Sequence, residues 1–117
     1  MKAKEYFDKY EEKIRAAASD DRALYFISKS LLIEFHNELS DMIKKRGITT
    51  DDGAVGAILE MNTKWNALGR RIEEKIGIPM LKRNGFRNIM VRQLPGLDKK
   101  LKARGVFVEE VKAEYET

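Results

Sequence analysis

The feature that most constrains this chain is a set of apolar residues that recur at helical spacing. The clearest stripe consists of Ile58, Met61, Trp65, Leu68, Ile72 and Ile76. Because an α-helix turns once in about 3.6 residues, steps of three and four place these side chains on one face. Thr49 or Thr50 can cap the start of this pattern, and Gly77 and Pro79 end it. We therefore predict one amphipathic helix between these signals.

Two further stripes precede this one. The first consists of Ala3, Tyr6, Phe7, Tyr10, Ile14 and Ala17, and the second of Leu24, Ile27, Leu31, Phe35, Leu39 and Met42. Ser19 and Asp20 form a suitable cap pair between them, and Gly47 can take the left-handed conformation that ends a helix. Four more residues widen the second stripe: Tyr25, Leu32, His36 and Ile43. We expect this helix to be central or to be shared with a partner chain.

The predicted fold class is mainly α, a small single-domain helical bundle with three main amphipathic helices and short C-terminal helices. A content of 43% apolar and 36% charged residues is typical of a folded chain, and 117 residues suit one domain. We divide it into a helical core, residues 1–77, and a basic C-terminal subregion with an acidic tail, residues 78–117. The short link from Gly47 to Thr50 predicts antiparallel second and third helices. Gly53 and Gly56 would let backbones approach closely there.

The C-terminal part is cut by glycine and proline into short pieces. Apolar residues between Phe86 and Leu101 keep helical spacing, so we predict two short helices that meet at Pro95. We predict a final helix around Val108, Val111 and Tyr115. A short β pairing near the C-terminus is the alternative.

Several classes are excluded by composition. The chain has no cysteine, and therefore no disulfide or thiolate site. The first ten residues lack the apolar core of a signal peptide, and no segment is long and apolar enough to span a bilayer. We predict a cytoplasmic protein without a membrane partner. Trp65, Met61, Met80 and Met90 are expected in the core, and no cofactor is predicted.

Charge is unevenly distributed along the chain. Residues 70–104 carry a net charge of +8, whereas residues 1–69 carry −1 and residues 105–117 carry −3. The cations of this basic segment are Arg70, Arg71, Lys75, Lys82, Arg83, Arg87, Arg92, Lys99, Lys100, Lys102 and Arg104. Lysine and arginine neutralise phosphates, and arginine and asparagine can pair with base edges. The segment indicates nucleic acid or an acidic protein surface as partner, or simply a solvated surface. The residues we predict for such binding are Arg83, Arg87, Asn88, Arg92, Lys99 and Lys102.

The other chemical candidates lie on the second helix. His36 is the only histidine, and Glu34 and Glu38 fall on the opposite side of the helix from it, so it is predicted as a core or interface residue. The run Glu38-Leu39-Ser40-Asp41 resembles half of the paired acidic motif of all-helical nucleotide pyrophosphatases of the MazG type. That resemblance implies a magnesium site with Glu34, Glu38 and Asp41. The nearest match to the other half is Asp8-Lys9-Tyr10-Glu11.

A second resemblance concerns the segments Met61-Asn62-Thr63-Lys64-Trp65-Asn66-Ala67-Leu68 and Leu81-Lys82-Arg83-Asn84-Gly85-Phe86. They resemble a pattern in small uncharacterised proteins of bacterial prophages and mobile elements. The resemblance implies an accessory protein that binds host or phage machinery. The leading hypothesis is a non-enzymatic binding protein that uses the basic surface. The alternatives are a structural protein with a homodimer through the second helix, and a metal-dependent nucleotide pyrophosphohydrolase.

Overall fold

The computed structural model describes residues 1–80 and 98–104. Three long helices, α1 (Ala3–Ala16), α2 (Asp21–Arg46) and α3 (Asp51–Ile76), are followed by a short helix, α6 (Asp98–Ala103). Within these residues no strand is present. The prediction of a mainly α, small helical bundle is confirmed.

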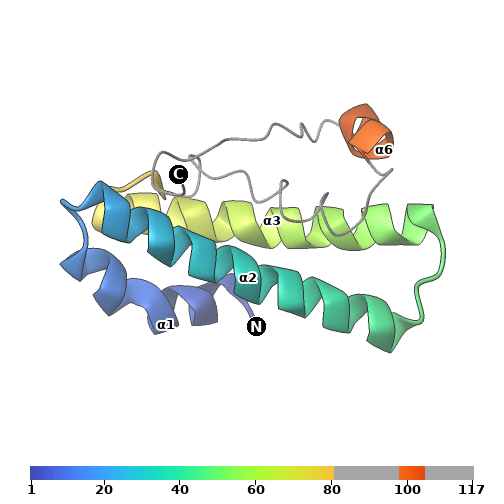
Figure 1. Ribbon diagram of the computed structural model, residues 1–117, viewed down its shortest axis with the longest axis horizontal. Helices are drawn as coiled ribbons and strands as arrows, with labels where there is room; N and C mark the ends of the chain where they lie inside the picture. Colours follow the sequence, from blue (N-terminus) through green and yellow to red (C-terminus); the bar gives the residue numbers. More distant parts are fainter. Residues whose placement is uncertain (81–97, 105–117) are drawn as a thin grey trace.

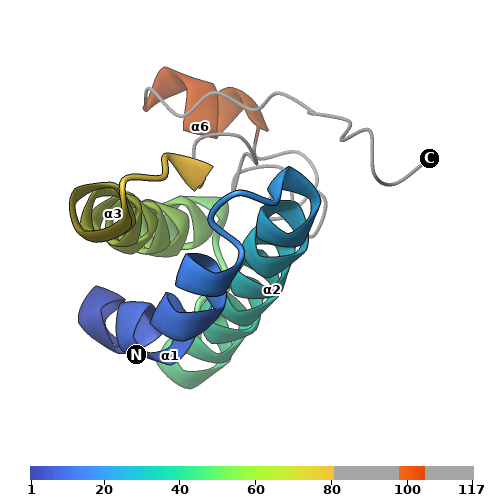
Figure 2. The same ribbon diagram turned by 90° about the vertical axis from the view of Figure 1, so that its left-hand side faces the viewer.

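α2 and α3 form a long antiparallel hairpin, as the short link between them predicted (Figure 1). α1 runs along the first half of α2, so the three helices form a triangle when they are seen from the end (Figure 2). α6 lies on the far side of the hairpin from α1, near the start of α3. The hairpin is therefore covered by α1 at one end and by α6 at the other.

The helix ends follow the predicted capping residues. The Asp20 side chain accepts a hydrogen bond from the Ala23 amide at 3.1 Å, and Thr50 Oγ1 accepts one from the Gly53 amide at 3.1 Å. Gly47 and Gly77 end α2 and α3 with φ values of 61° and 84°, which favour glycine. These local signals fix the lengths of the two arms of the hairpin.

An aromatic cluster joins the three long helices at the centre of the core. The rings of Tyr6 in α1 and Phe35 in α2 stack with centroids 4.4 Å apart, and Phe35 meets Trp65 of α3 edge to face at 5.0 Å. Phe35 is fully buried, and Trp65 is a core residue, as predicted. Such pairs stabilise a core by about 1 kcal/mol beyond the burial of their area.

Two details of the sequence interpretation need correction. A Cβ at Gly53 would lie 2.9 Å from Ile48 Cγ2, so close approach occurs there, but a Cβ at Gly56 would meet nothing within 4 Å. The expectation for Gly56 was therefore wrong. Ser28, which was not expected in the core, is fully buried.

The C-terminal predictions are covered only in part. α6 agrees with the predicted helix after Pro95, and its Leu101 is buried in the same core as the long helices. Met80 is also buried in that core. The predicted helix before Pro95, the final helix and its alternative β pairing lie outside the described residues, as does Met90.

Candidate functional site

The two glutamates proposed for magnesium lie along the seam between α1 and α2. Tyr6 Oη donates a hydrogen bond to Glu38 Oε2 at 2.9 Å, and Tyr10 Oη donates one to Glu34. Tyr6 and Tyr10 are four residues apart on α1, and Glu34 and Glu38 are four residues apart on α2. Because α1 and α2 run antiparallel, a step of one turn along α1 matches a step of one turn back along α2. The two tyrosines and two glutamates therefore form a ladder that fixes the register of these helices.

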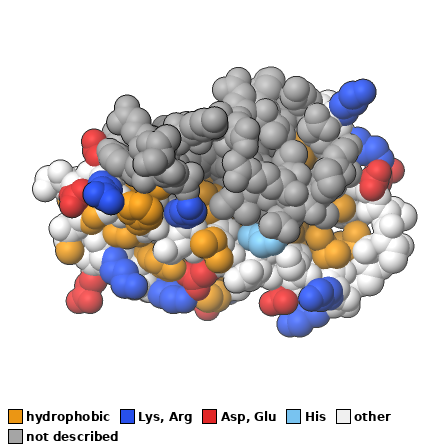
Figure 3. Space-filling view, in the orientation of Figure 1, with side chains coloured by type: hydrophobic (Ala, Val, Ile, Leu, Met, Phe, Trp, Pro, Cys, Tyr) orange, Lys and Arg blue, Asp and Glu red, His pale blue; other side chains and the backbone are white. Residues whose placement is uncertain are grey.

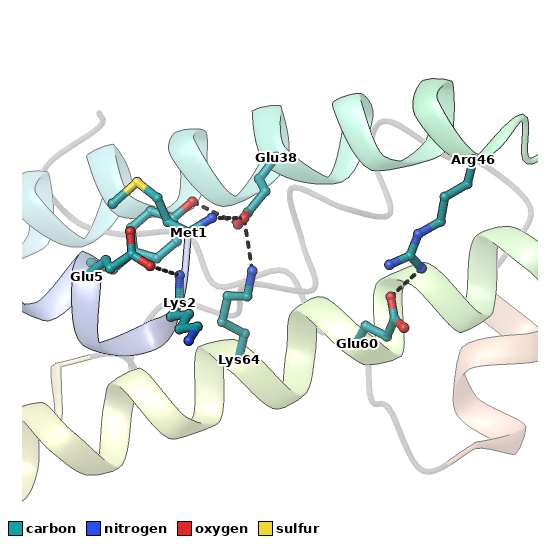
Figure 4. A network of polar contacts seen from close by, with 8 residues as sticks. Met1, Lys2, Glu5, Glu38, Arg46, Glu60 and Lys64 are labelled. Carbon is teal, nitrogen blue, oxygen red and sulfur yellow. Dashed lines mark hydrogen bonds and ion pairs between the residues drawn. The ribbon is translucent and has the colours of Figure 1, made fainter.

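Amino groups pair with both glutamates of this ladder, and Figure 4 shows those at Glu38. Lys64 of α3 donates to Glu38 Oε1 at 2.9 Å, and the amino group of Met1 pairs with the same oxygen. Lys9 of α1 pairs with Glu34. Glu38 thus connects α1, α2 and α3 through one carboxylate.

A second ion pair joins α2 and α3 nearer the hairpin turn. Arg46 Nη1 lies 2.6 Å from Glu60 Oε2 (Figure 4). The side chains of this pair are 53% and 54% exposed, whereas those of Lys64 and Glu38 are 23% and 21% exposed. Because solvent screens exposed pairs, the contact at Glu38 contributes more to stability.

The electrostatics of the ladder favour ionised glutamates and neutral tyrosines. Burial opposes the ionised form of Glu38, but hydrogen bonds from the amino terminus, Lys64 and Tyr6 outweigh it and lower its pKa from the ordinary value of 4.5. Burial also opposes ionisation of Glu34, and hydrogen bonds from Lys9 and Tyr10 likewise lower its pKa. Burial, together with the hydrogen bond to Glu38, raises the pKa of Tyr6 well above its ordinary value.

These contacts favour a structural role for Glu34 and Glu38 over the magnesium site implied by the MazG resemblance. Both carboxylate oxygens of Glu38 already accept hydrogen bonds, from Tyr6 and from Lys64, so the charge of Glu38 is balanced without a divalent ion. Across the described residues, no group of three or more His, Cys, Asp or Glu side chains is placed to hold a metal ion. His36 is half-buried on α2, with no hydrogen-bond partner for its Nδ1 within the described part of the chain.

Few of the predicted binding residues lie in the described part of the chain. Lys99 is exposed on α6, and the backbone of Lys102 belongs to the same helix. The other four, Arg83, Arg87, Asn88 and Arg92, lie outside the described residues. The structure therefore places two of the six predicted residues on one short helix.

The remaining described cations of the basic segment fall into two groups. Lys100 on α6 lies 3.5 Å from Asp51 and 3.4 Å from Asp52, at the start of α3. Arg70 and Lys75 are exposed at the opposite end of α3. Since a helix rises 1.5 Å per residue, about 35 Å of α3 separates Asp52 from Lys75.

Arg71 takes a different role from the other cations. It is half-buried, and its guanidinium lies 5.4 Å from the centroid of the Phe7 ring on α1. This geometry allows a cation–π contact that links α3 to α1. Arg71 belongs to the basic segment, but its guanidinium lies beside an aromatic ring of α1.

The outer side of α2 carries exposed apolar side chains that lie off the predicted stripe. Phe26 and Ile33 are 42% and 49% exposed, and with Met1 they are the large apolar side chains exposed in the described part of the chain. α2 runs across the front of Figure 1, and Figure 3 shows hydrophobic side chains over its first half. The four residues that widened the predicted stripe are less exposed than these: Leu32 is buried, and Tyr25, His36 and Ile43 are half-buried.

Sequence reasoning missed the ladder because it considered each helix alone. The sequence does contain a sign of it: two tyrosines and two glutamates have the same spacing of four residues, in two helices joined by a short turn. Sequence reasoning missed the exposed apolar side chains because Phe26 and Ile33 are off the main stripe.

Comparisons with known proteins place the chain in no family. Neither protein-family models, nor curated proteins, nor solved structures gave a match. Among the described helices, none has the length and apolar character needed to cross a membrane.

Proposed function

We propose that this protein is a non-enzymatic binding protein whose basic C-terminal segment engages nucleic acid. The observation that carries the proposal is the net charge of +8 over residues 70–104, beside −1 and −3 in the rest of the chain. A concentration of cations in 35 residues costs free energy through self-repulsion. A polyanionic partner relieves that repulsion.

The described cations of this segment support the proposal because most of them are available. Lys99, Arg104, Arg70 and Lys75 are exposed, and none has an ion-pair partner within residues 1–80 and 98–104. Lys100 does have partners, but its contacts of 3.4 and 3.5 Å are long and solvent-exposed. A phosphate group can replace such contacts at small cost.

The positions of these cations set the size of ligand that engages all of them. The group on α6 and the group at the end of α3 are separated by about 35 Å along α3. Because duplex DNA rises about 3.4 Å per base pair, a duplex of about ten base pairs spans that distance. We expect affinity to rise with duplex length up to about that size and to change little beyond it.

The test is fluorescence-anisotropy titration of labelled single- and double-stranded DNA and RNA at two salt concentrations. We expect binding that weakens with salt, because each phosphate contact releases counterions. Replacing Arg87 and Arg92 together by Glu should weaken binding to all sequences and reduce the logarithmic salt slope by about two.

A matched pair of single substitutions separates this site from a general effect of charge. Lys99→Glu on α6 and Lys4→Glu on α1 change the net charge equally, and both side chains are exposed. We expect a loss of affinity for Lys99→Glu and little change for Lys4→Glu. No binding at low salt, or equal losses for the two variants, would contradict the proposal and direct the search to an acidic protein partner.

A further inference from the structure

One cation of the basic segment is in contact with acidic side chains of the bundle itself. α6 lies near the start of α3 (Figure 1), and Lys100 Nζ on α6 is 3.5 Å from Asp51 Oδ2 and 3.4 Å from Asp52 Oδ1. Lys100 and Asp52 are 48 positions apart in the sequence, so they meet only because α6 packs against the hairpin. The contact is therefore a property of the tertiary fold and of neither helix alone.

α6 is held in this place by an apolar side chain next to Lys100. Leu101 is fully buried and belongs to the same core as the long helices. Because adjacent residues of a helix project about 100° apart, the Lys100 side chain leaves α6 beside this buried contact. The backbone of α6 is already ordered by Leu101, so only the lysine side chain loses freedom when the ion pairs form.

The two aspartates are stabilised at this position independently of Lys100. They occupy the first turn of α3, directly after the capping residue Thr50. The N-terminal end of a helix carries a partial positive charge that favours acidic side chains. Their side chains are also 69% and 89% exposed, so water solvates them well. Lys100 can therefore exchange these carboxylates for another anion without leaving a buried charge unpaired.

Two carboxylates face one ammonium group at this end of the bundle. The three side chains carry two negative charges and one positive charge, whereas the basic segment as a whole carries +8. A phosphate that reaches Lys100 comes well within the screening length of about 8 Å of both carboxylates at physiological salt. Asp51 and Asp52 therefore oppose, at Lys100, the polyanion that the rest of the segment attracts.

We propose that Asp51 and Asp52 form an autoinhibitory contact with Lys100, which the phosphate groups of a nucleic acid displace on binding. This inference rests on the proposed function, because it concerns a cation of the same basic segment. In the free protein the two carboxylates hold the Lys100 ammonium. In the complex a phosphate oxygen takes their place.

The exposure of the contact sets the size of its effect. The Lys100 side chain is 46% exposed, and water and salt screen ion pairs of this kind. The coupling measured for such pairs corresponds to a change in an equilibrium constant of about two- to fivefold. Asp51 and Asp52 therefore weaken binding without preventing it.

The first experiment compares the affinity of the wild type, Asp51→Asn/Asp52→Asn and a charge-matched control for a labelled DNA duplex. The control, Asp8→Asn/Glu12→Gln, removes two exposed carboxylates from α1 and changes the net charge equally. We expect Asp51→Asn/Asp52→Asn to bind about two- to fivefold more tightly, and the control to bind about as the wild type does. The logarithmic salt slope of the first variant should steepen by about one, because Lys100 then adds a phosphate contact. Circular dichroism of both variants checks that the bundle is intact.

The second experiment repeats the comparison in chains that carry Lys100→Gln. We expect the gain from Asp51→Asn/Asp52→Asn to disappear there, because the carboxylates then have no lysine to release. An equal gain with and without Lys100→Gln would show general repulsion and would overturn the inference. Equal affinities of the wild type and Asp51→Asn/Asp52→Asn would overturn it also, and would leave the proposed function intact. If none of these chains binds nucleic acid at low salt, the proposed function fails together with the inference.

Discussion

Replacing Glu38 by Gln tests whether the ladder holds the three long helices together. Gln keeps the size of the side chain and one acceptor oxygen, but it removes the charge that Lys64 and Tyr6 contact at 2.9 Å each. Hydrogen bonds to charged groups contribute about 1.5–3 kcal/mol when they are shielded from solvent. Because the Glu38 side chain is 21% exposed, we discount this to a loss of about 1–2 kcal/mol.

The assay is thermal and urea unfolding of the wild type and the variant at neutral pH. For a domain of this size, the loss corresponds to a decrease in Tm of roughly 4–8 °C. The matched control is Glu60→Gln, which removes a carboxylate from the more exposed pair with Arg46. We expect a cost of at most about 0.5 kcal/mol for that control.

The same experiment has a predicted pH dependence. The pKa of Glu38 is lowered in the folded protein from its ordinary value of 4.5, so its contribution is present above pH 4.5 and is lost as the pH falls through the folded-state pKa. The difference in unfolding free energy between wild type and Glu38→Gln should therefore shrink in acid. Equal costs for Glu38→Gln and Glu60→Gln, or a Glu38→Gln cost that is unchanged in acid, would refute the role assigned to the ladder.

Two further predictions concern stability and are checked by the same unfolding measurements. Gly56→Ala should stabilise the protein by about 1 kcal/mol, since alanine is the better helix former and its Cβ meets open space. Gly53→Ala should give no such gain, because its Cβ would lie 2.9 Å from Ile48 Cγ2; equal gains from the two variants would contradict this reasoning. Ser28→Ala should leave stability unchanged or raise it by about 1 kcal/mol, because the buried Ser28 hydroxyl has no hydrogen-bond partner in the described part of the chain. A loss of more than about 1 kcal/mol would contradict this prediction.

The sequence predicted the features of the fold that depend on neighbours along the chain. Asp20, Thr50, Gly47 and Gly77 mark helix ends through their own side chains or their backbone freedom, so their roles could be identified without a structure. The stripe around Trp65 was also predicted correctly, because a regular helix places such residues on one side whatever covers them.

Features that depend on the pairing of helices could not be predicted in the same way. The contact between Tyr6 and Glu38 joins residues 32 positions apart, and it requires the orientation and register of two helices. Ser28 has the periodic position of a core residue, but its polar side chain excluded it from an apolar stripe. The sequence shows which residues of the basic segment are charged, but it does not show where their side chains lie. It therefore could not distinguish Arg71, which lies over Phe7, from exposed Arg70.

The apolar residues around α2 differ in how far the bundle covers them. Among the residues that widened the stripe, Leu32 is buried and the other three are half-buried, whereas Phe26 and Ile33 are exposed. Sequence can count apolar positions around a helix, but only the packed neighbours decide which of them stay open.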